Sequence, residues 1–559
     1  MYARGMDAVS AHYSQPDPAS TEALRLRGAG VALGGGRLFG VTAEALAILA
    51  LVPLAAAVVG SLGVVGPTGG YVYWWGTARG WESLARTMAV AAPAGAMAVL
   101  MAWVLVASAV RLSPQWALAL IMAACLPLLL PSSLLATAWI VALGREGLIT
   151  GWLRQVAGDC PVVLYTIPGA AAVTALRYFG IAALVLLHAR LRREGEWPAS
   201  RVAAIPPVSA AWHLGLRADA RPALAAWLLV TLFSMNDPII PGMLLVSTYG
   251  TQVLIQYSAL LNPAGAAALA APMAAVGAAL MAATVLAGRD LWFAPSEPPA
   301  PVRRPRGLLV AVLTALAAAA VLALALAVPA AVLAARTESP AAVVRALADA
   351  RDQAWQTLYV ASAGAALATA AAAMLAHHWV AREREGARSA VPLVLLNLTV
   401  PPSLLGIGMI SLFQGTPTAV RDSSAPLVLG YAVRFLPVAT LLLYALWRRE
   451  PPDALLAARV HGVPAWRAAW TVAWLPRRAA VAGAALLAAL LMATDLETSI
   501  FLAPAGGSTL GVRLYTLIHT APDASVAALA LGILALTVPA ILLLAAVAAL
   551  GRTGGARGA

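Results

Sequence analysis

Apolar runs long enough to cross a lipid bilayer recur along the whole of this 559-residue chain. About 20 apolar residues in a helix span the roughly 30 Å hydrocarbon core, and the chain offers twelve runs of about that length. These runs lie near 44–65, 88–110, 117–143, 161–189, 223–247, 263–287, 307–334, 357–380, 391–413, 427–447, 479–503 and 523–549. Because a backbone in lipid has no water to bond to, only helices or closed barrels can cross it. The pattern predicts an all-α polytopic membrane protein with about 12 transmembrane helices.

Composition agrees with that class and excludes several functions. The chain is 61% hydrophobic and 11% charged, whereas soluble domains carry roughly 25% charged residues. Its net charge of +13 comes from 37 arginines and no lysine. Basic residues gather in the cytoplasmic loops of membrane proteins, so the charge does not indicate nucleic acid. A Walker A loop requires lysine, so any ATP, with its Mg, must be bound and hydrolysed by a partner, and we expect no enzyme activity and no cofactor here.

The distribution of arginine orients the helices. If the N-terminus is cytosolic, the cytoplasmic segments hold 26 of the 37 arginines, and the richest loops are 190–222 and 448–478. This bias predicts a multi-pass protein of the plasma (inner, cytoplasmic) membrane with both termini in the cytosol. The two cysteines and seven histidines show no ligand spacing, so we predict no metal site.

The second half of the chain repeats the first. TMAVAAPAGAMA from Thr87 resembles TLYVASAGAALA from Thr357, PSSLL from Pro131 resembles PSLL from Pro402, and further on the offset settles near 258. At that offset, the matched pairs are Asp237 with Asp495, Thr251 with Thr509, and Tyr257 with Tyr515. An even number of helices in each repeat gives both halves the same orientation, and a transport pathway is expected where they meet. The predicted parts are a cytosolic disordered tail 1–42, a six-helix half 43–288, a Pro/Arg-rich cytosolic linker 289–306, a six-helix half 307–550 and a cytosolic tail 551–559.

One loop of the second half carries a recognisable motif. The stretch LLAARVHGVPAWRAAWTVAWLP within 448–478 combines small residues, a glycine and a Leu-Pro step. It resembles the EAA loop of ABC importer permeases, and its flanks RFLPVATLLLYALW and DLETSIFLAPAGGSTLGVRLYTLIH are similar to the ferric-iron and thiamine permease family. The residues that match are Ala457, Ala458, Gly462, Trp466, Val472, Leu475 and Pro476. Leu456 stands where the family has glutamate, and one extra residue follows the glycine.

The resemblance implies that this loop docks on an ATPase subunit. Small Ala457 and Ala458 would allow close approach, Gly462 would adopt the positive φ that ends a helical turn, and Pro476 would begin the next membrane helix. The first-half loop, SRVAAIPPVSAAWHLGLRADARP, has Ile205 in place of the glycine and keeps only Trp212 and Arg221-Pro222. We therefore expect unequal docking sites. The alternative for both loops is a solvated, arginine-rich segment without a docking role.

Three carboxylates in the membrane-spanning runs are candidates for the pathway. Asp237 and Asp495 occupy equivalent positions, roughly 25 Å along the fifth helix of each half, and Glu497 lies nearby. Ionisable residues at such depth are costly and are usually functional. Two interpretations remain open: these carboxylates line the outer vestibule of a path for a cationic solute, or they cap helices and face headgroups or a binding protein. Arg177 and Arg434, also equivalent, are potential partners. Pro238 and Pro241 should break the first of these helices.

The sequence thus favours the fused, two-half permease subunit of a binding-protein-dependent type I ABC importer. The resemblance implies an ATPase dimer, an extracytoplasmic solute-binding protein and membrane lipid as partners. Ferric iron is the first choice of solute and thiamine the second, and phosphonates, polyamines or another small solute remain open. Two alternatives remain: a twelve-helix secondary transporter that is independent of an ATPase, and a membrane scaffold that transports nothing.

Overall fold

The structure is a computed structural model. It describes residues 45–46, 48–62, 71–76, 78–158, 161–193, 217–289, 308–384, 391–448, 458, 460–464, 467, 469–504, 506–521 and 523–556. Within these ranges every regular element is a helix. The predicted all-α fold is confirmed for the described part of the chain.

The helices follow one another along the chain with short connections. In the first part they are α3 (Val52–Leu62), α4 (Tyr71–Trp75), α5 (Ala78–Ala109), α6 (Pro114–Cys125), η1 (Leu126–Leu129), α7 (Ser132–Leu143), α8 (Leu148–Ala157), η2 (Val163–Tyr165), α9 (Ile167–Arg193), α12 (Arg217–Met235), α13 (Ile239–Met243), α14 (Tyr249–Leu254), η4 (Ile255–Ala259) and α15 (Pro263–Ala287). In the second part they are α17 (Leu308–Leu322), η5 (Ala323–Ala327), α18 (Val328–Arg336), α19 (Pro340–Asp349), α20 (Arg351–Arg384), α21 (Val391–Thr399), α22 (Pro402–Phe413), α23 (Thr418–Arg421), α24 (Ala425–Trp447), η6 (Ala469–Trp474), η7 (Leu475–Arg477), α27 (Arg478–Ala493), α28 (Leu496–Leu502), α29 (Leu510–Thr520) and α30 (Asp523–Ala556).

Eight helices of the described residues are long and apolar enough to cross a membrane, and a ninth span is formed if α27 and α28 are counted together across their bend. The described residues therefore contain fewer continuous membrane-spanning helices than the twelve that the apolar runs predicted. Proline accounts for two of the divisions. The run 223–247 is divided at Pro238 into α12 and α13, and the run 391–413 is divided at Pro401 into α21 and α22. Proline lacks the amide hydrogen that a continuing helix needs.

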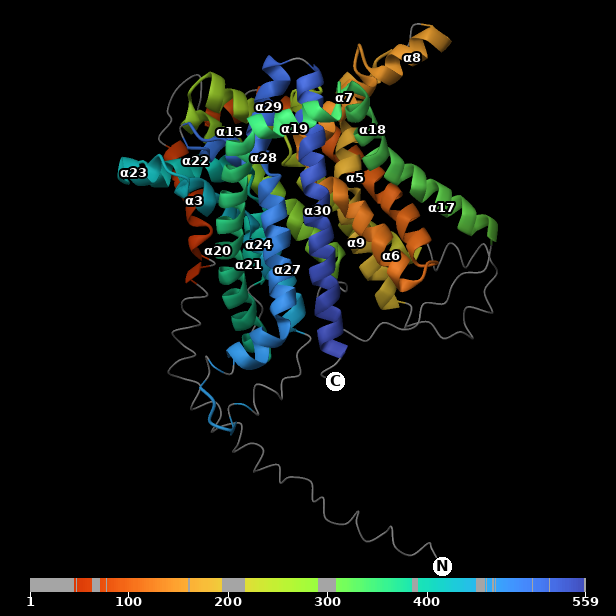
Figure 1. Cartoon of the computed structure of the whole chain (residues 1–559). Coiled ribbons are helices and arrows are strands. Elements are labelled where there is room, and N and C mark those ends of the chain that lie inside the picture. The colour runs from red at the N-terminus through yellow and green to blue at the C-terminus, as the bar shows by residue number, and fades with distance from the viewer. Residues whose placement is uncertain are drawn as a thin grey trace, which may run out of the picture.

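The long helices form two groups that stand side by side (Figure 1). In one group α5 packs against α9 and α12, and in the other α20 packs against α24 and α27. The C-terminal end of α30 and the segment that precedes α27 lie at the same end of these helices, whereas α19 and α29 lie at the opposite end. In Figure 1 the break between α27 and α28 lies between these two ends.

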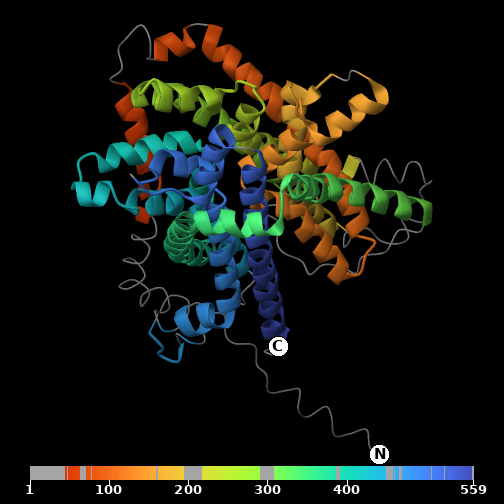
Figure 2. The same cartoon turned by 45° about the horizontal axis from the view of Figure 1, so that its top comes forward.

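The first helix of each half packs on the other half. Helix α3 contacts α22 and α15, and α17 contacts α5 while α18 contacts α7 and α30. Figures 1 and 2 show α17 beside the first group of helices, and Figure 1 shows α3 beside α22. The contact of α3 is close because Gly408 has no side chain: a Cβ there would lie 1.9 Å from the carbonyl oxygen of Pro53. Only glycine allows the two backbones to approach this far.

A matched pair of hydrogen bonds relates the two groups. The hydroxyl of Thr87 on α5 accepts from the amide of Tyr249 at the start of α14, at 2.8 Å. The hydroxyl of Thr357 on α20 accepts from the amide of Leu510 at the start of α29, also at 2.8 Å. The residue before each of these helices is a threonine, Thr248 and Thr509. The structural counterpart of Thr509 is therefore Thr248, three positions before the predicted Thr251, because Thr248 and Thr509 are the residues that directly precede the two helices.

A second match shifts by one residue for the same reason. Helix α7 begins after Pro131, whose φ and ψ are −55° and 138°, and α22 begins after Pro401, with −58° and 138°. The conformational equivalent of Pro131 is thus Pro401, not Pro402. Each proline is itself the extended residue directly before its helix, and the fixed φ of proline favours this conformation.

Candidate functional site

In the first half, a buried ion pair lies where the fifth predicted run breaks. The guanidinium of Arg177 on α9 stands 3.6 Å from Asp237 (Nε to Oδ2), and the two side chains are 9% and 1% exposed. The hydroxyl of Tyr178 donates to the same carboxylate oxygen at 3.1 Å. Arg177 also donates to the carbonyl of Leu130, in front of the break at Pro131. One arginine therefore holds two chain breaks together.

Asp237 also satisfies the backbone beyond the break. Its Oδ1 accepts from the amides of Ile239 and Ile240, at 3.0 and 3.4 Å. These are first-turn amides of α13 that have no partner within the helix. Asp237 therefore caps the start of α13 with its side chain buried, and the predicted break at Pro238 is found.

The second half has a larger cluster at the equivalent place. Arg434 on α24 contacts Asp495 at 3.2 Å (Nη1 to Oδ1) and Glu497 at 3.0 Å (Nη2 to Oε2). Its Nη1 also donates to Thr498 at 2.8 Å. Both carboxylate side chains are less than a tenth exposed. The expected pairing of Arg177 and Arg434 with the three candidate carboxylates is therefore confirmed.

The break in this half has no proline. Helix α27 ends at Ala493, α28 begins at Leu496, and their axes differ by 66°. The hydroxyl of Tyr431 donates to the carbonyl of Asp495 at 3.0 Å and lies 2.6 Å from the hydroxyl of Ser499. These bonds satisfy backbone and side chain at the bend. Non-helical backbone at membrane depth is tolerated where it is buried in protein or lines a cavity.

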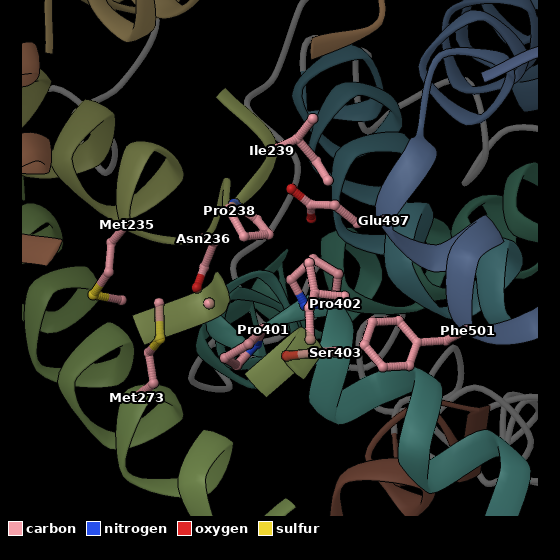
Figure 3. Close-up of a pocket in the computed structure, with 12 residues that line it drawn as sticks. Met235, Asn236, Pro238, Ile239, Met273, Pro401, Pro402, Ser403, Glu497 and Phe501 are labelled. Carbon is pink, nitrogen blue, oxygen red and sulfur yellow. The ribbon is translucent and has the colours of Figure 1, made fainter. Parts of the chain in front are cut away.

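A small cavity lies where the broken segments of both halves meet. The first half supplies Met235, Asn236, Pro238, Ile239, Gly250, Leu254 and Met273, and the second half supplies Pro401, Pro402, Ser403, Glu497 and Phe501. The volume of the cavity is about 20 Å³, which is room for one or two water molecules. Figure 3 shows Asn236 and Glu497 projecting into this space from opposite sides. In the conformation described, the cavity does not admit a solute of ordinary size.

Of the three candidate carboxylates, only Glu497 lines the cavity. Asp237 and Asp495 lie behind it, each against its arginine. Among the described residues no group of three or more His, Cys, Asp or Glu side chains is arranged to hold a metal ion. The chemistry that the cavity offers is therefore one carboxylate, one amide, a hydroxyl at Ser403, and apolar and aromatic surface from the methionines and Phe501.

The predicted docking segment is described in part. Ala457 and Trp466 lie outside the described residues. Gly462 has φ of +73°, and the amide of Val463 donates to the carbonyl of Ala458 at 3.0 Å. A glycine in the left-handed conformation with this six-to-one bond forms a Schellman end to a helical turn. The positive φ expected at Gly462 is confirmed, and both Gly462 and Val460 are exposed.

The segment then leads into the membrane helix. Val472 lies in η6, Leu475 and Pro476 form η7, and α27 begins at the next turn. The expected helix start at Leu475-Pro476 is thus found as a short 3-10 turn that continues into α27. Leu475 is 43% exposed.

Sequence reasoning did not single out a row of aromatic side chains that joins this segment to the bundle. Trp470 stacks on Trp474 with ring centroids 6.0 Å apart, and Trp474 lies 5.9 Å from Trp447 at the end of α24. Trp447 in turn lies 6.4 Å from His377 on α20. Trp470 is 55% exposed, whereas Trp447 is 2% exposed. The only sequence signal was the high density of tryptophan on both sides of the loop.

The first-half loop is represented only by its end. Ile205 and Trp212 lie outside the described residues, and Arg221 and Pro222 lie in the first turns of α12. The structure adds a residue that the sequence did not suggest: Asp219 is buried and accepts from Arg190 at 2.6 Å. It also accepts from the indole of Trp103 at 3.1 Å. This contact fixes the start of α12 against α9 and α5.

Compared with protein-family models, with curated proteins and with solved structures, the chain finds no match.

Proposed function

We propose that the chain is the membrane permease subunit of an ATP-driven importer, with two six-helix halves fused in one polypeptide. The protein would reside in the plasma membrane, and both of its termini would lie in the cytosol. A separate ATPase dimer would bind ATP and Mg and dock on the cytosolic face. A solute-binding protein would deliver the solute at the opposite face.

The observation that carries the proposal is the segment between α24 and α27. It presents an exposed, glycine-terminated helical turn at Gly462 and leads without a gap from η6 into α27. Helix α27 ends at the bend near Asp495, and Glu497, just beyond the bend, lines the cavity between the halves and pairs with Arg434. A movement of the segment before α27 can therefore be passed along this helix to the bend beside the cavity. Rigid-body movement of packed helices is the usual way in which such a change is transmitted.

The solute class follows from the cavity and the resemblance together. The side chain of Glu497 and the acceptor oxygens around it favour a cation, and ferric iron remains the first choice with thiamine the second. The solute would enter after the halves separate, because the present cavity holds no more than one or two waters.

A second candidate function is a secondary transporter that needs no ATPase. The observation that favours it is the buried carboxylate of Glu497 beside the cavity, since carboxylates of this kind couple proton or ion movement in such proteins. That function gives the exposed turn at Gly462 no role.

The deciding experiment is co-purification of the full chain with the ATPase from the same organism, followed by native mass spectrometry. The importer proposal predicts a complex that Gly462→Asp weakens at least tenfold, because aspartate is strained at this φ and adds a charge to the docking surface. The matched control is Gly415→Asp: Gly415 is also exposed, and a Cβ at this position would meet no atom within 4 Å. No complex with wild-type protein, together with solute uptake in vesicles that lack the ATPase, would favour the secondary transporter.

A further inference from the structure

The described residues donate a hydrogen bond to one of the two carboxylate oxygens of Glu497. Its side chain is 9% exposed, and Oε2 accepts from Arg434 at 3.0 Å. Among the described residues none donates a hydrogen bond to the other oxygen, Oε1. Figure 3 shows the carboxylate directed into the cavity, toward Pro238 and Ile239. Because Glu497 lines the cavity, this oxygen is available there to a donor or a cation.

A second acceptor faces the same space from the first half. The side-chain oxygen of Asn236 is buried and has no hydrogen-bond partner among the described residues. Asn236 lines the cavity opposite Glu497 (Figure 3). Leaving a buried acceptor without a partner costs about 1–3 kcal/mol. Each half therefore supplies one acceptor beside the cavity that has no donor among the described residues, which suits the cavity to a cationic ligand.

The charges around the cavity give the sign of that ligand. Arg177 and Arg434 face three carboxylates, those of Asp237, Asp495 and Glu497. With all five ionised, these side chains carry one more negative charge than positive. A buried charge without a partner costs several kcal/mol, so a single positive charge in the cavity would balance the cluster.

Arg434 has an alternative position that would free Glu497 for such a ligand. Asp495, whose side chain is 6% exposed, bonds Arg434 through Oδ1, while its Oδ2 is buried and without a partner among the described residues. A small rotation of the guanidinium would move Nη2 from Glu497 to that oxygen. The result is a two-bond Arg–Asp pair, which is the geometry that guanidinium and carboxylate prefer.

We propose that the cavity between the halves binds a single monovalent cationic group through Glu497 and Asn236, and that Arg434 exchanges Glu497 for the second oxygen of Asp495 as the cation enters. The exchange keeps every buried charge paired throughout. The first half cannot do the same, since the residue at the position of Glu497 is Ile239 and Arg177 pairs with Asp237 alone. The cationic group is either a small free ion or, where the solute is thiamine or another monovalent cation, the charged head of that solute.

The proposal rests on the proposed function only in placing the cavity on a transport path. Binding can be measured on the purified full chain without ATPase, so its failure would leave the importer proposal intact. The thermal unfolding midpoint is recorded in detergent while ammonium chloride or tetramethylammonium chloride replaces an inert salt at constant ionic strength. Ammonium fits the cavity as described, whereas tetramethylammonium requires it to open.

For the wild-type chain we expect a saturable rise in the midpoint with at least one of the two ions. Glu497→Gln should abolish the rise, since the amide keeps the bond from Arg434 but loses the charge. The control Glu338→Gln removes an exposed carboxylate of the same half and should leave the rise unchanged. A response to ammonium alone indicates a small resident ion, and a response to tetramethylammonium indicates the head of a solute.

Asp495→Asn tests the exchange itself. Without a second charged oxygen for Arg434, the half-saturating cation concentration should increase at least tenfold even where the variant folds as well as the wild type. A purely structural Asp495 would lower the midpoint without changing the half-saturating concentration. Absence of any saturable rise would overturn the proposal and indicate that Glu497 holds a proton. A rise that persists in Glu497→Gln would also overturn it, since the cation would then bind elsewhere.

Discussion

The two halves hold their broken helices with different amounts of charge. In the first half one arginine meets one aspartate, and the break is already imposed by Pro238. In the second half one arginine meets two carboxylates, and no proline is present at the bend between α27 and α28. The first break is fixed by covalent geometry, whereas the second depends on side-chain contacts that can rearrange. The capacity for movement therefore belongs to the half whose loop also carries the motif that we propose to dock an ATPase.

Replacing each arginine should change the stability of the chain more than any other test of this difference. Arg177→Met strands one buried carboxylate, and a loss of about 3–5 kcal/mol in the free energy of unfolding is expected. Arg434→Met strands two carboxylates and should cost more. Thermal or denaturant unfolding of the purified chain in detergent measures both.

The control for these variants is Arg421→Met. Arg421 contacts Asp422 at 2.9 Å, but both side chains are well exposed, so no measurable change is expected. An Arg434→Met variant that is no less stable than Arg177→Met would contradict the comparison, since it would mean that Glu497 carries no charge.

A second test examines where the halves should agree. Thr87→Val and Thr357→Val each remove the acceptor of a buried amide, that of Tyr249 or Leu510. Each change should cost about 1–3 kcal/mol, and the two costs should match within about 0.5 kcal/mol. The double variant tests their independence: uncoupled sites give the sum of the two costs. Clearly unequal costs would mean that the two bonds are not equivalent parts of a repeat.

The smallest expected effect concerns two glycines at helix contacts. A Cβ at Gly95 would lie 2.6 Å from the hydroxyl of Thr231, whereas one at Gly364 would lie 3.1 Å from the sulfur of Met492. Gly95→Ala should therefore destabilise the chain by about 1–2 kcal/mol. A Cβ at Gly364 would also lie 3.1 Å from the Cβ of Tyr431. Gly364→Ala should therefore cost less than Gly95→Ala, because methionine adapts its shape and alanine favours a helix. Equal losses in unfolding measurements would show that the two contacts are equally rigid.

The sequence predicted features that depend on local chemistry. Apolar length predicted the long helices, proline predicted the break at Pro238, and glycine predicted the positive φ at Gly462. The paired positions of Arg177 and Arg434 were enough to suggest their carboxylate partners.

Features that depend on distant contacts could not be predicted. The bend at Asp495 has no local breaker and relies on Arg434 and Tyr431 from another helix. The arginine-rich sequence around Asp219 is typical of a solvated loop, but Asp219 lies buried in the first turn of α12. The cavity required the relative placement of both halves, which no run of residues encodes.

The packing of α3 on α22 has a consequence for how the protein is made. About 350 residues separate these helices along the chain, and a ribosome adds roughly 5–20 residues per second. Helix α3 must therefore wait roughly 20–70 s after its synthesis before its partner exists. During that time the backbone at Pro53, which contacts Gly408 in the folded chain, is without α22. Assembly of the first half cannot be completed until most of the second has been translated.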